Sequence, residues 1–158
     1  DVGFHAHNNL SMAVVNSVVA VESGAKIIDA CSRGLGAGAG NCQLEVLVAV
    51  LQKMGYLENL DLYKLMDLSE NVVANIMKRP QVISSISLTS GLAGVFSGFA
   101  PHAKRAAKRF GVDARDILIE LGKRKVVAGQ EDIIVEVAMY LKQRKESKKH
   151  IDSIEALI

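Results

Sequence analysis

Two short strand candidates separated by a helix, all within the first 55 residues, place the strongest constraint on the fold. Residues 2–7 and 26–30 are predicted strands, and the helix between them is expected to begin after a Ser11 cap and to end at Gly24. Such a unit makes its two strands parallel, with a right-handed crossover. Because parallel sheets are covered on both faces and usually contain more strands, we expect this segment to belong to a larger sheet, completed by other chains or by a longer polypeptide.

A (β/α)₈ barrel, the TIM barrel, is a larger fold that accommodates this pattern. Such a barrel needs roughly 250 residues, so the α/β segment fits as its last two β/α units. The chain enters its first strand directly from Asp1, without a leading loop or helix, which favours the same interpretation. We therefore predict that residues 1–58 are the C-terminal part of a TIM-barrel domain.

Beyond Gly55 the sequence predicts helices only. Asp61 is a candidate cap for a helix that stops before Pro80, and Asp113 is a candidate cap for a later one. Helices are expected over residues 61–76, 101–110 and 113–121 and from residue 130 onward. We predict an α/β protein, mostly helical over this length, in which an all-α domain occupies residues 59–158.

Two histidines at the end of the first predicted strand are candidate metal ligands. In a strand, residues i and i+2 share one face, so His5 and His7 would point the same way. Two imidazoles make half of a divalent-metal site, which then needs at least one carboxylate. Asp29, at the end of the second strand, is the local candidate, either as a ligand or as a carboxylate that contacts a ligand. Ordinary structural histidines are the alternative.

A glycine-rich loop, Ser32–Asn41, follows the second strand and has three interpretations. Its spacing fits a relaxed dinucleotide-binding fingerprint, but residues 57–61 lack the acidic strand end that this fingerprint expects. The loop can also bring backbone N–H groups to an anion at a helix N-terminus. The third interpretation is a tight connection that needs left-handed backbone angles. The last two remain open.

Composition and charge exclude several classes of function. The net charge of +2 and the 4% aromatic content, with no Trp, argue against a nucleic-acid partner. No apolar run is long enough to span a membrane. Two cysteines without a secretory signal predict reduced thiols in a cytoplasmic protein. A run of four cations has two open interpretations, a solvated helix face or a partner surface: Lys104, Arg105, Lys108 and Arg109.

Three motifs together identify a family resemblance. The segments Gly3–Asn9 (GFHAHNN), Gly34–Asn41 (GLGAGAGN) and Leu44–Val46 (LEV) closely resemble the 4-hydroxy-2-oxovalerate aldolases. These belong to a wider group of pyruvate aldolases that includes hydroxymethylglutaryl-CoA lyase and isopropylmalate synthase. Residues 111–132 are similar to the C-terminal helical domain of the same family, so the resemblance covers nearly the whole chain as a C-terminal portion.

The resemblance implies a metal-dependent lyase. His5 and His7, with an Asp from the first barrel strand, would hold a divalent cation, usually Mn²⁺. The substrate, 4-hydroxy-2-oxopentanoate, would be cleaved to pyruvate and acetaldehyde, and Asn8, Asp29 and Asn41 would lie near the substrate or around the metal ligands. The family implies a role in aromatic hydrocarbon catabolism. It also implies a dimer or hetero-oligomer in which acetaldehyde is channelled to an acylating acetaldehyde dehydrogenase through contacts of the helical domain.

Two departures from the family keep other functions open. Phe96 stands where the family has an active-site Tyr, and the first barrel strand, with its Asp, Arg and His, is not in this sequence. A non-catalytic helical interaction module therefore remains an alternative. A related acyl-CoA lyase or synthase of the same superfamily remains another.

Overall fold

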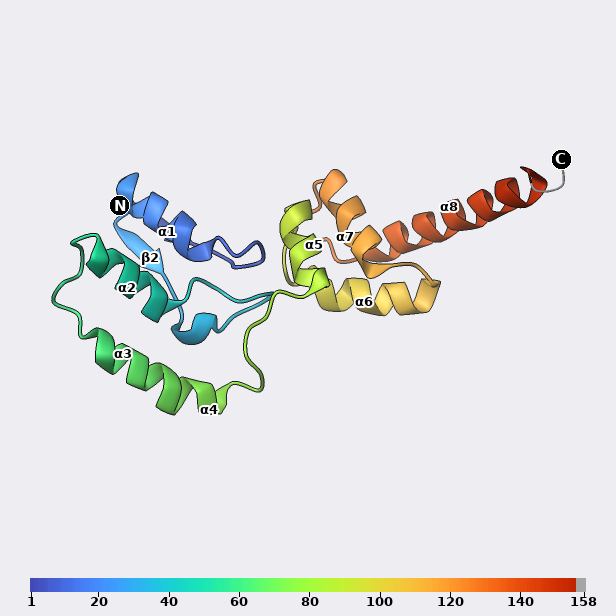
Figure 1. Cartoon of the computed structure of the whole chain (residues 1–158). Coiled ribbons are helices and arrows are strands. Elements are labelled where there is room, and N and C mark those ends of the chain that lie inside the picture. The colour runs from blue at the N-terminus through green and yellow to red at the C-terminus, as the bar shows by residue number, and fades with distance from the viewer. Residues whose placement is uncertain (156–158) are drawn as a thin grey trace. The chain divides into compact units, whose positions relative to one another are not determined.

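The computed structural model describes the backbone of residues 1–155 and the side chains of residues 1–148. It divides into two compact units, Asp1–Ser84 and a second unit that begins at Ser85. The division lies beyond residue 58, the predicted boundary, because the helices that follow this residue pack against elements of the first unit. Figure 1 shows both units, which are described separately. Residues 156–158, part of the predicted helical domain, lie outside the description.

The first unit contains the predicted strand–helix–strand element. Strand β1 (Gly3–His5) pairs in parallel with β2 (Ile27–Asp29), and helix α1 (Ala13–Glu22) connects them. The first strand is shorter than predicted because the chain leaves the ladder after His5. There the backbone binds the glycine-rich loop instead, with Cys42 N donating to Ala6 O at 3.0 Å and Asn8 N to Gly40 O at 2.8 Å.

The predicted Ser11 cap is wrong. Ser11 adopts a left-handed φ of 61°, and no side chain caps α1 from its N-cap residue, Met12. Instead the Asn8 side chain accepts a hydrogen bond from Ala13 N at 3.2 Å, so it satisfies one of the free N–H groups at the start of the helix. The predicted end is confirmed, because Gly24 has φ 97°.

Short helices complete the first unit. A 3₁₀ turn, η1 (Ser32–Gly34), opens the glycine-rich loop, and α2 (Leu44–Lys53) follows the loop. The predicted helix over residues 61–76 is present as three consecutive pieces: α3 (Leu62–Leu68), a π-helical segment η2 (Ser69–Val73) and α4 (Ala74–Ile76). Asp61 caps α3 as predicted, since its Oδ1 accepts from Lys64 N at 3.1 Å.

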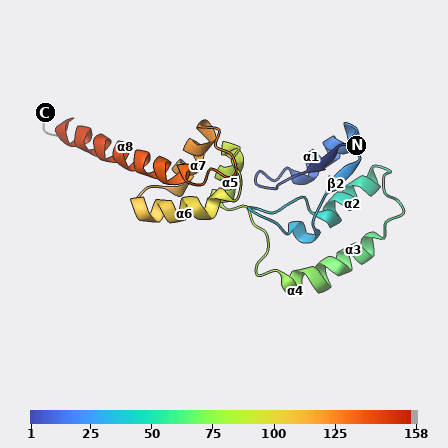
Figure 2. The ribbon, with the colours of Figure 1, turned by 180° about the vertical axis from the view of Figure 1, so that it is seen from behind.

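The core of the first unit lies between the strands and the two helices α1 and α2. Its buried residues include Ala6, Ala13 and Leu47, and Phe4 and Ile28 pack against them from the strands. The alternating side chains of each strand place His5 and Asp29 on the exposed side. Figure 2 shows the helices of this unit from behind.

Over its described residues, the second unit is a bundle of four helices. These are α5 (Ser85–Ala93), α6 (Phe99–Phe110), α7 (Ala114–Lys123) and α8 (Ile133–Glu155). Helix α6 ends at Gly111 (φ 68°), and Asp113 caps α7 as predicted. The buried core is made from Phe99, Ile117, Leu118, Leu121 and Val137. Among the residues described, no helix has the length and apolar character needed to cross a membrane.

Candidate metal and substrate site

The two strands end side by side on polar residues. His5 and Asp29 are register partners in the parallel ladder, so the last residue of β1 lies next to the last residue of β2. His5 Nδ1 lies 3.4 Å from Asp29 Oδ2. This approach leaves Nε2 as the ring nitrogen of His5 that is directed to another partner. Asp29 therefore lies next to a candidate metal ligand, and its role as a ligand or as a carboxylate that contacts a ligand stays a prediction.

His7 joins His5 although it lies beyond the end of β1. The two ring centroids are 4.9 Å apart and the rings are nearly perpendicular, at 78°. His7 is held there by an isolated antiparallel bridge to Asn41 of the glycine-rich loop. The structure thus brings together two imidazoles and a carboxylate, and the backbone of Asn41 lies beside that of His7.

This donor set suits a divalent cation but does not complete its coordination. Imidazole nitrogen and carboxylate or amide oxygen are ligands that Mn²⁺, Zn²⁺ and similar cations accept. Within the described residues, no group of three or more His, Cys, Asp or Glu side chains is arranged to hold a metal. A further ligand is therefore required beyond this group.

The Asn41 side chain has one satisfied and one unsatisfied end. Its Nδ2 donates to Cys31 Sγ at 3.2 Å and to Leu35 O at 3.1 Å. Its Oδ1 is buried and has no hydrogen-bond partner in the described part of the chain. Because an unpaired buried oxygen is costly, this atom is a candidate acceptor or ligand atom for a group that binds here.

Two glycines make this arrangement of the loop feasible. A Cβ atom at Gly36 would lie 2.4 Å from Asn41 Nδ2, so a side chain there would displace the amide. Gly40 has φ 97°, and a Cβ atom would lie 2.3 Å from the Gly34 carbonyl oxygen. The left-handed angles support the interpretation of the loop as a tight connection.

The two consecutive asparagines have different structural roles. Asn8, predicted to lie near substrate or metal, uses its Oδ1 to accept from Ala13 N at the start of α1. Asn9, which the sequence analysis did not select, is buried, and its Oδ1 accepts from Ala39 N at 3.0 Å. Asn9 therefore fixes the glycine-rich loop against the segment that carries His7. Two consecutive asparagines after a strand were the sequence signal that could have indicated this role.

Sequence reasoning also missed Glu45, at the start of α2. Its carboxylate accepts hydrogen bonds from the Ser32 hydroxyl and from Arg33 N, at 2.9 and 3.1 Å to its two oxygens. Burial alone would raise the pKa of Glu45, but hydrogen bonds from Ser32, Ser69 and backbone N–H groups outweigh it and lower the pKa below its ordinary value. These contacts hold Arg33 at a left-handed φ of 54°.

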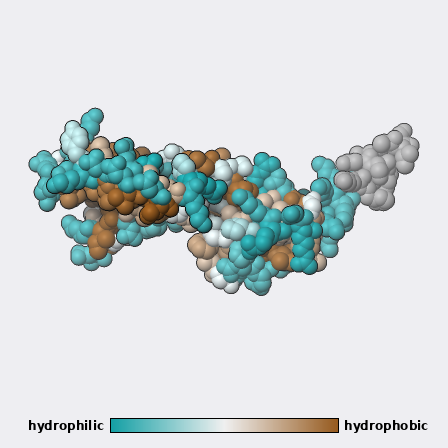
Figure 3. Space-filling view, turned by 90° about the horizontal axis from the view of Figure 1, so that it is seen from below, coloured by the Kyte–Doolittle hydropathy of each residue, from teal (hydrophilic) through white to brown (hydrophobic). Residues whose placement is uncertain are grey.

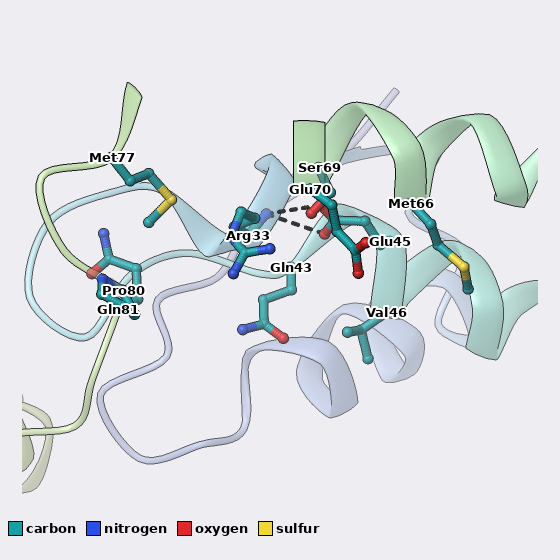
Figure 4. Close-up of a pocket in the computed structure, with 10 residues that line it drawn as sticks. All are labelled: Arg33, Gln43, Glu45, Val46, Met66, Ser69, Glu70, Met77, Pro80 and Gln81. Carbon is teal, nitrogen blue, oxygen red and sulfur yellow. Dashed lines mark hydrogen bonds between the residues drawn. The ribbon is translucent and has the colours of Figure 1, made fainter. Parts of the chain in front are cut away.

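Glu45 lines a cavity of about 320 Å³ in the first unit. Figure 4 shows that the lining side chains come from the glycine-rich loop, the start of α2, helix α3, the π-helical segment and the residues after α4. Gln81 reaches the loop from this last segment, where its Nε2 donates to Gly36 O at 3.2 Å. The loop is thus held by Glu45 at its start and by Gln81 at Gly36.

Phe96 lies in the second unit, between α5 and α6. Its ring packs edge-on against Phe99 with a centroid distance of 5.7 Å, and the residue remains 51% exposed. A Cβ atom at Gly98 would collide with this ring, so the glycine gives Phe96 its space. Phe96 has no hydroxyl, and the structure shows an exposed aromatic surface at this position.

Comparisons with known families divide the chain in a similar way. Residues 1–72 match the HMGL-like family, and residues 81–143 match the DmpG-like communication domain. Among curated relatives, 4-hydroxy-2-oxovalerate aldolases from Brevibacillus brevis (59% identical) and Bacillus thuringiensis (61% identical) match over 94% and 92% of this chain. The chain covers 44% and 42% of the length of these two relatives.

One solved structure resembles the chain over part of its length. It is described as "the N-terminal domain of a putative aldolase" from Bacteroides vulgatus. The likeness has a TM-score of 0.54 and 31% sequence identity, and it covers 61% of this chain and 32% of the solved one.

The matched segments define the class as an aldolase-type α/β segment followed by a communication domain. Over nearly its whole length the chain is similar to proteins named 4-hydroxy-2-oxovalerate aldolase, and it spans less than half of the length of these relatives.

Proposed function

We propose that the chain contributes to metal-dependent cleavage of a 4-hydroxy-2-oxoacid, such as 4-hydroxy-2-oxopentanoate, to pyruvate and an aldehyde. The observation that carries this proposal is the convergence of His5 and His7 beside Asp29. The high identity to relatives named for this activity supports it. Removal of the 4-hydroxyl proton and cleavage of the C3–C4 bond leave the electron pair on the enolate of pyruvate, which is then protonated at C3.

In this proposal His5 and His7 would hold a divalent cation, Mn²⁺, which would supply Lewis-acid chemistry for the cleavage. Asp29, whose Oδ2 lies 3.4 Å from Nδ1 of His5, would accept a hydrogen bond from an Nδ1–H group and so favour the tautomer with an unprotonated Nε2. Asn41 offers Oδ1 towards the metal or the substrate, and Asn8 orients the segment by its contact with α1. The remaining carboxylate ligand and the base come from parts of the relatives that this chain does not span.

We also propose that residues 1–58 are two β/α units of a (β/α)₈ barrel. The parallel pairing of β1 and β2, the HMGL-like match and the likeness to an aldolase domain support this assignment. In such barrels the reacting groups lie where strands end and loops begin. The position of His5 and Asp29 at the ends of their strands agrees with that rule.

We further propose that the helical segment that follows binds an acylating acetaldehyde dehydrogenase, in a dimer or hetero-oligomer that channels acetaldehyde. The match of residues 81–143 to a communication domain supports this partner. The assembly would act in aromatic hydrocarbon catabolism. Its cytoplasmic location is supported by the free thiols of Cys31 and Cys42.

Substitution of His7 tests the proposed activity. His7→Ala in the complete protein should abolish Mn²⁺-dependent release of pyruvate from 4-hydroxy-2-oxopentanoate and weaken Mn²⁺ binding in calorimetry, because too few ligands remain. Lys26→Ala, an exposed residue at the other end of the strand pair, is the matched control and should leave both unchanged. Full turnover by His7→Ala at saturating Mn²⁺ would refute the ligand assignment. No pyruvate from the unaltered protein would favour the acyl-CoA lyase or the interaction module.

A further inference from the structure

The exposed face of α6 carries four cations that have no ion-pair partner in the described part of the chain. Phe99, Ala103 and Ala106 bury one side of this helix in the core. The opposite side presents exposed basic residues: Lys104, Arg105, Lys108 and Arg109. Figure 3 views the second unit from the side of α6, and hydrophilic side chains dominate that face. Among the described residues, no carboxylate lies within ion-pair distance of these four.

The cations of α6 differ from two arginines elsewhere in the second unit that do have carboxylate partners. Elsewhere in the second unit Arg115 pairs with Asp113, and Arg124 pairs with both Glu120 and Glu136. On α6 the spacing of the cations is itself unfavourable, because like charges four residues apart destabilise a helix. The helix dipole favours cations only in the last turn, so it does not account for Lys104 and Arg105. A counter-charge from outside the chain would offset this repulsion.

A cavity of about 300 Å³ lies beside this basic face, between α6 and the start of α8. Its walls combine cationic and apolar side chains: His102, Arg105, Arg109, Phe110, Ile134 and Val135. The Arg109 guanidinium lies 5.2 Å from the centroid of the Phe110 ring. The acid at the rim, Glu131, accepts a hydrogen bond from Gly129 N at 3.1 Å and forms no ion pair with either arginine among the described residues.

We propose that the α6 face and this cavity form a docking surface for an acidic protein surface, one that presents carboxylates around an apolar side chain. The inference rests on the proposed function, in that the occupant is the acylating dehydrogenase of the same assembly. A protein fits better than a nucleic acid, because the chain has few aromatic side chains for base stacking and a net charge of only +2. A membrane fits less well, because the apolar side of α6 is already buried in the core.

The experiment measures association of the complete protein with a purified acylating acetaldehyde dehydrogenase at several salt concentrations. The double substitution Lys104→Glu/Arg105→Glu should lower the association rate at low salt at least tenfold, and the deficit should shrink as salt rises. Pyruvate release without the dehydrogenase should not change. Lys104→Gln/Arg105→Gln, which also removes the repulsion on α6, should show a smaller loss with its helix content retained in circular dichroism. Lys53→Glu/Lys78→Glu is the control with an equal change of net charge on exposed residues of the first unit.

The outcomes separate the docking surface from the function on which it rests. Association that is weakened by the α6 variants and not by the control supports the proposal. Normal, salt-independent association of both α6 variants overturns the docking surface but leaves the partner in place. A wild-type protein that releases pyruvate and does not associate overturns the partner and the docking surface, but not the lyase. Binding to phosphatidylserine vesicles that is lost in the α6 variants, with dehydrogenase binding intact, would assign this face to a membrane and overturn the proposal.

Discussion

The Glu45 carboxylate connects the loop after β2, the start of α2 and the π-helical segment through a few hydrogen bonds. We predict that Glu45→Gln, which keeps the size of the side chain and removes its charge, loosens the glycine-rich loop without unfolding the unit. The amide has one acceptor oxygen instead of two. The carboxylate oxygens accept hydrogen bonds from Ser32 and Arg33. The NH₂ group of the amide faces one of these donors and cannot accept its hydrogen bond.

The expected magnitude for the loop follows from the two hydrogen bonds that the carboxylate accepts from loop residues. A hydrogen bond to a charged group contributes about 1.5–3 kcal/mol, and one between neutral groups about 0.5–1.5 kcal/mol. The bonds from the Ser32 hydroxyl and Arg33 N therefore each weaken by about 1 kcal/mol. The total, about 2 kcal/mol in the free energy of local opening, corresponds to roughly thirty-fold faster amide exchange in the loop.

Hydrogen–deuterium exchange of peptides that cover residues 31–42 measures this change directly. Glu22→Gln, the same substitution at an exposed position on α1, is the control and should leave exchange unchanged. Arg33→Gly in the Glu45→Gln background should recover part of the loss, since glycine adopts the left-handed φ of 54° without strain. Exchange within about twofold of wild type in Glu45→Gln would refute the assigned role.

The same carboxylate gives the loop a pH dependence. Because the pKa of Glu45 is lowered in the folded protein, its stabilisation is complete above the ordinary pKa of a glutamate. It is lost as the pH falls through the lowered folded value. Wild type and Glu45→Gln should therefore converge in loop protection at acidic pH, with the difference fully present near neutrality.

Three further substitutions test other parts of the chain. Hydrogen bonds from Arg115 hold the pKa of Asp113 at about 2. This stabilisation is therefore present above the ordinary aspartate pKa and declines as the pH approaches 2. Asp113→Asn can still cap α7, and its thermal melts should lack that decline. Gly36→Ala should displace the Asn41 amide and weaken Mn²⁺ binding about tenfold in calorimetry; unchanged affinity would remove Asn41 from the metal site. Phe96→Tyr should raise kcat by about tenfold or more if the missing hydroxyl limits catalysis, and an unaltered kcat would assign that role to another residue.

Local sequence signals predicted several features of the fold correctly. Asp61 and Asp113 cap their helices, because a short acidic side chain before an apolar periodic segment has one favourable use. Gly111 ends α6 in the left-handed conformation. The neighbouring positions of His5 and Asp29 followed from the parallel pairing of two strands that each end on a polar residue.

Features that depend on contacts between distant segments were not predictable from local patterns. The Ser11 cap failed because Asn8, five residues before the first helical N–H group, competes for it and leaves Ser11 in a left-handed turn. The role of Glu45 depends on Ser69, which belongs to a π-helical segment that periodicity does not distinguish from an α-helix. The division of the structure after Ser84 depends on how the helices after residue 58 pack, and the predicted domain boundary at residue 58 stays a prediction.

The pair of strands has a practical consequence for work with this part of the family. Within the described residues the sheet contains only β1 and β2, so each strand has an outer edge with unpaired backbone groups. Beside these edges, Val2 and Ile27 are 68% and 56% exposed. Such edges recruit further strands, in a native sheet or in an aggregate. A polypeptide limited to these residues should therefore aggregate through these edges. Flanking strands, or lysines placed at the two edges, should restore its solubility.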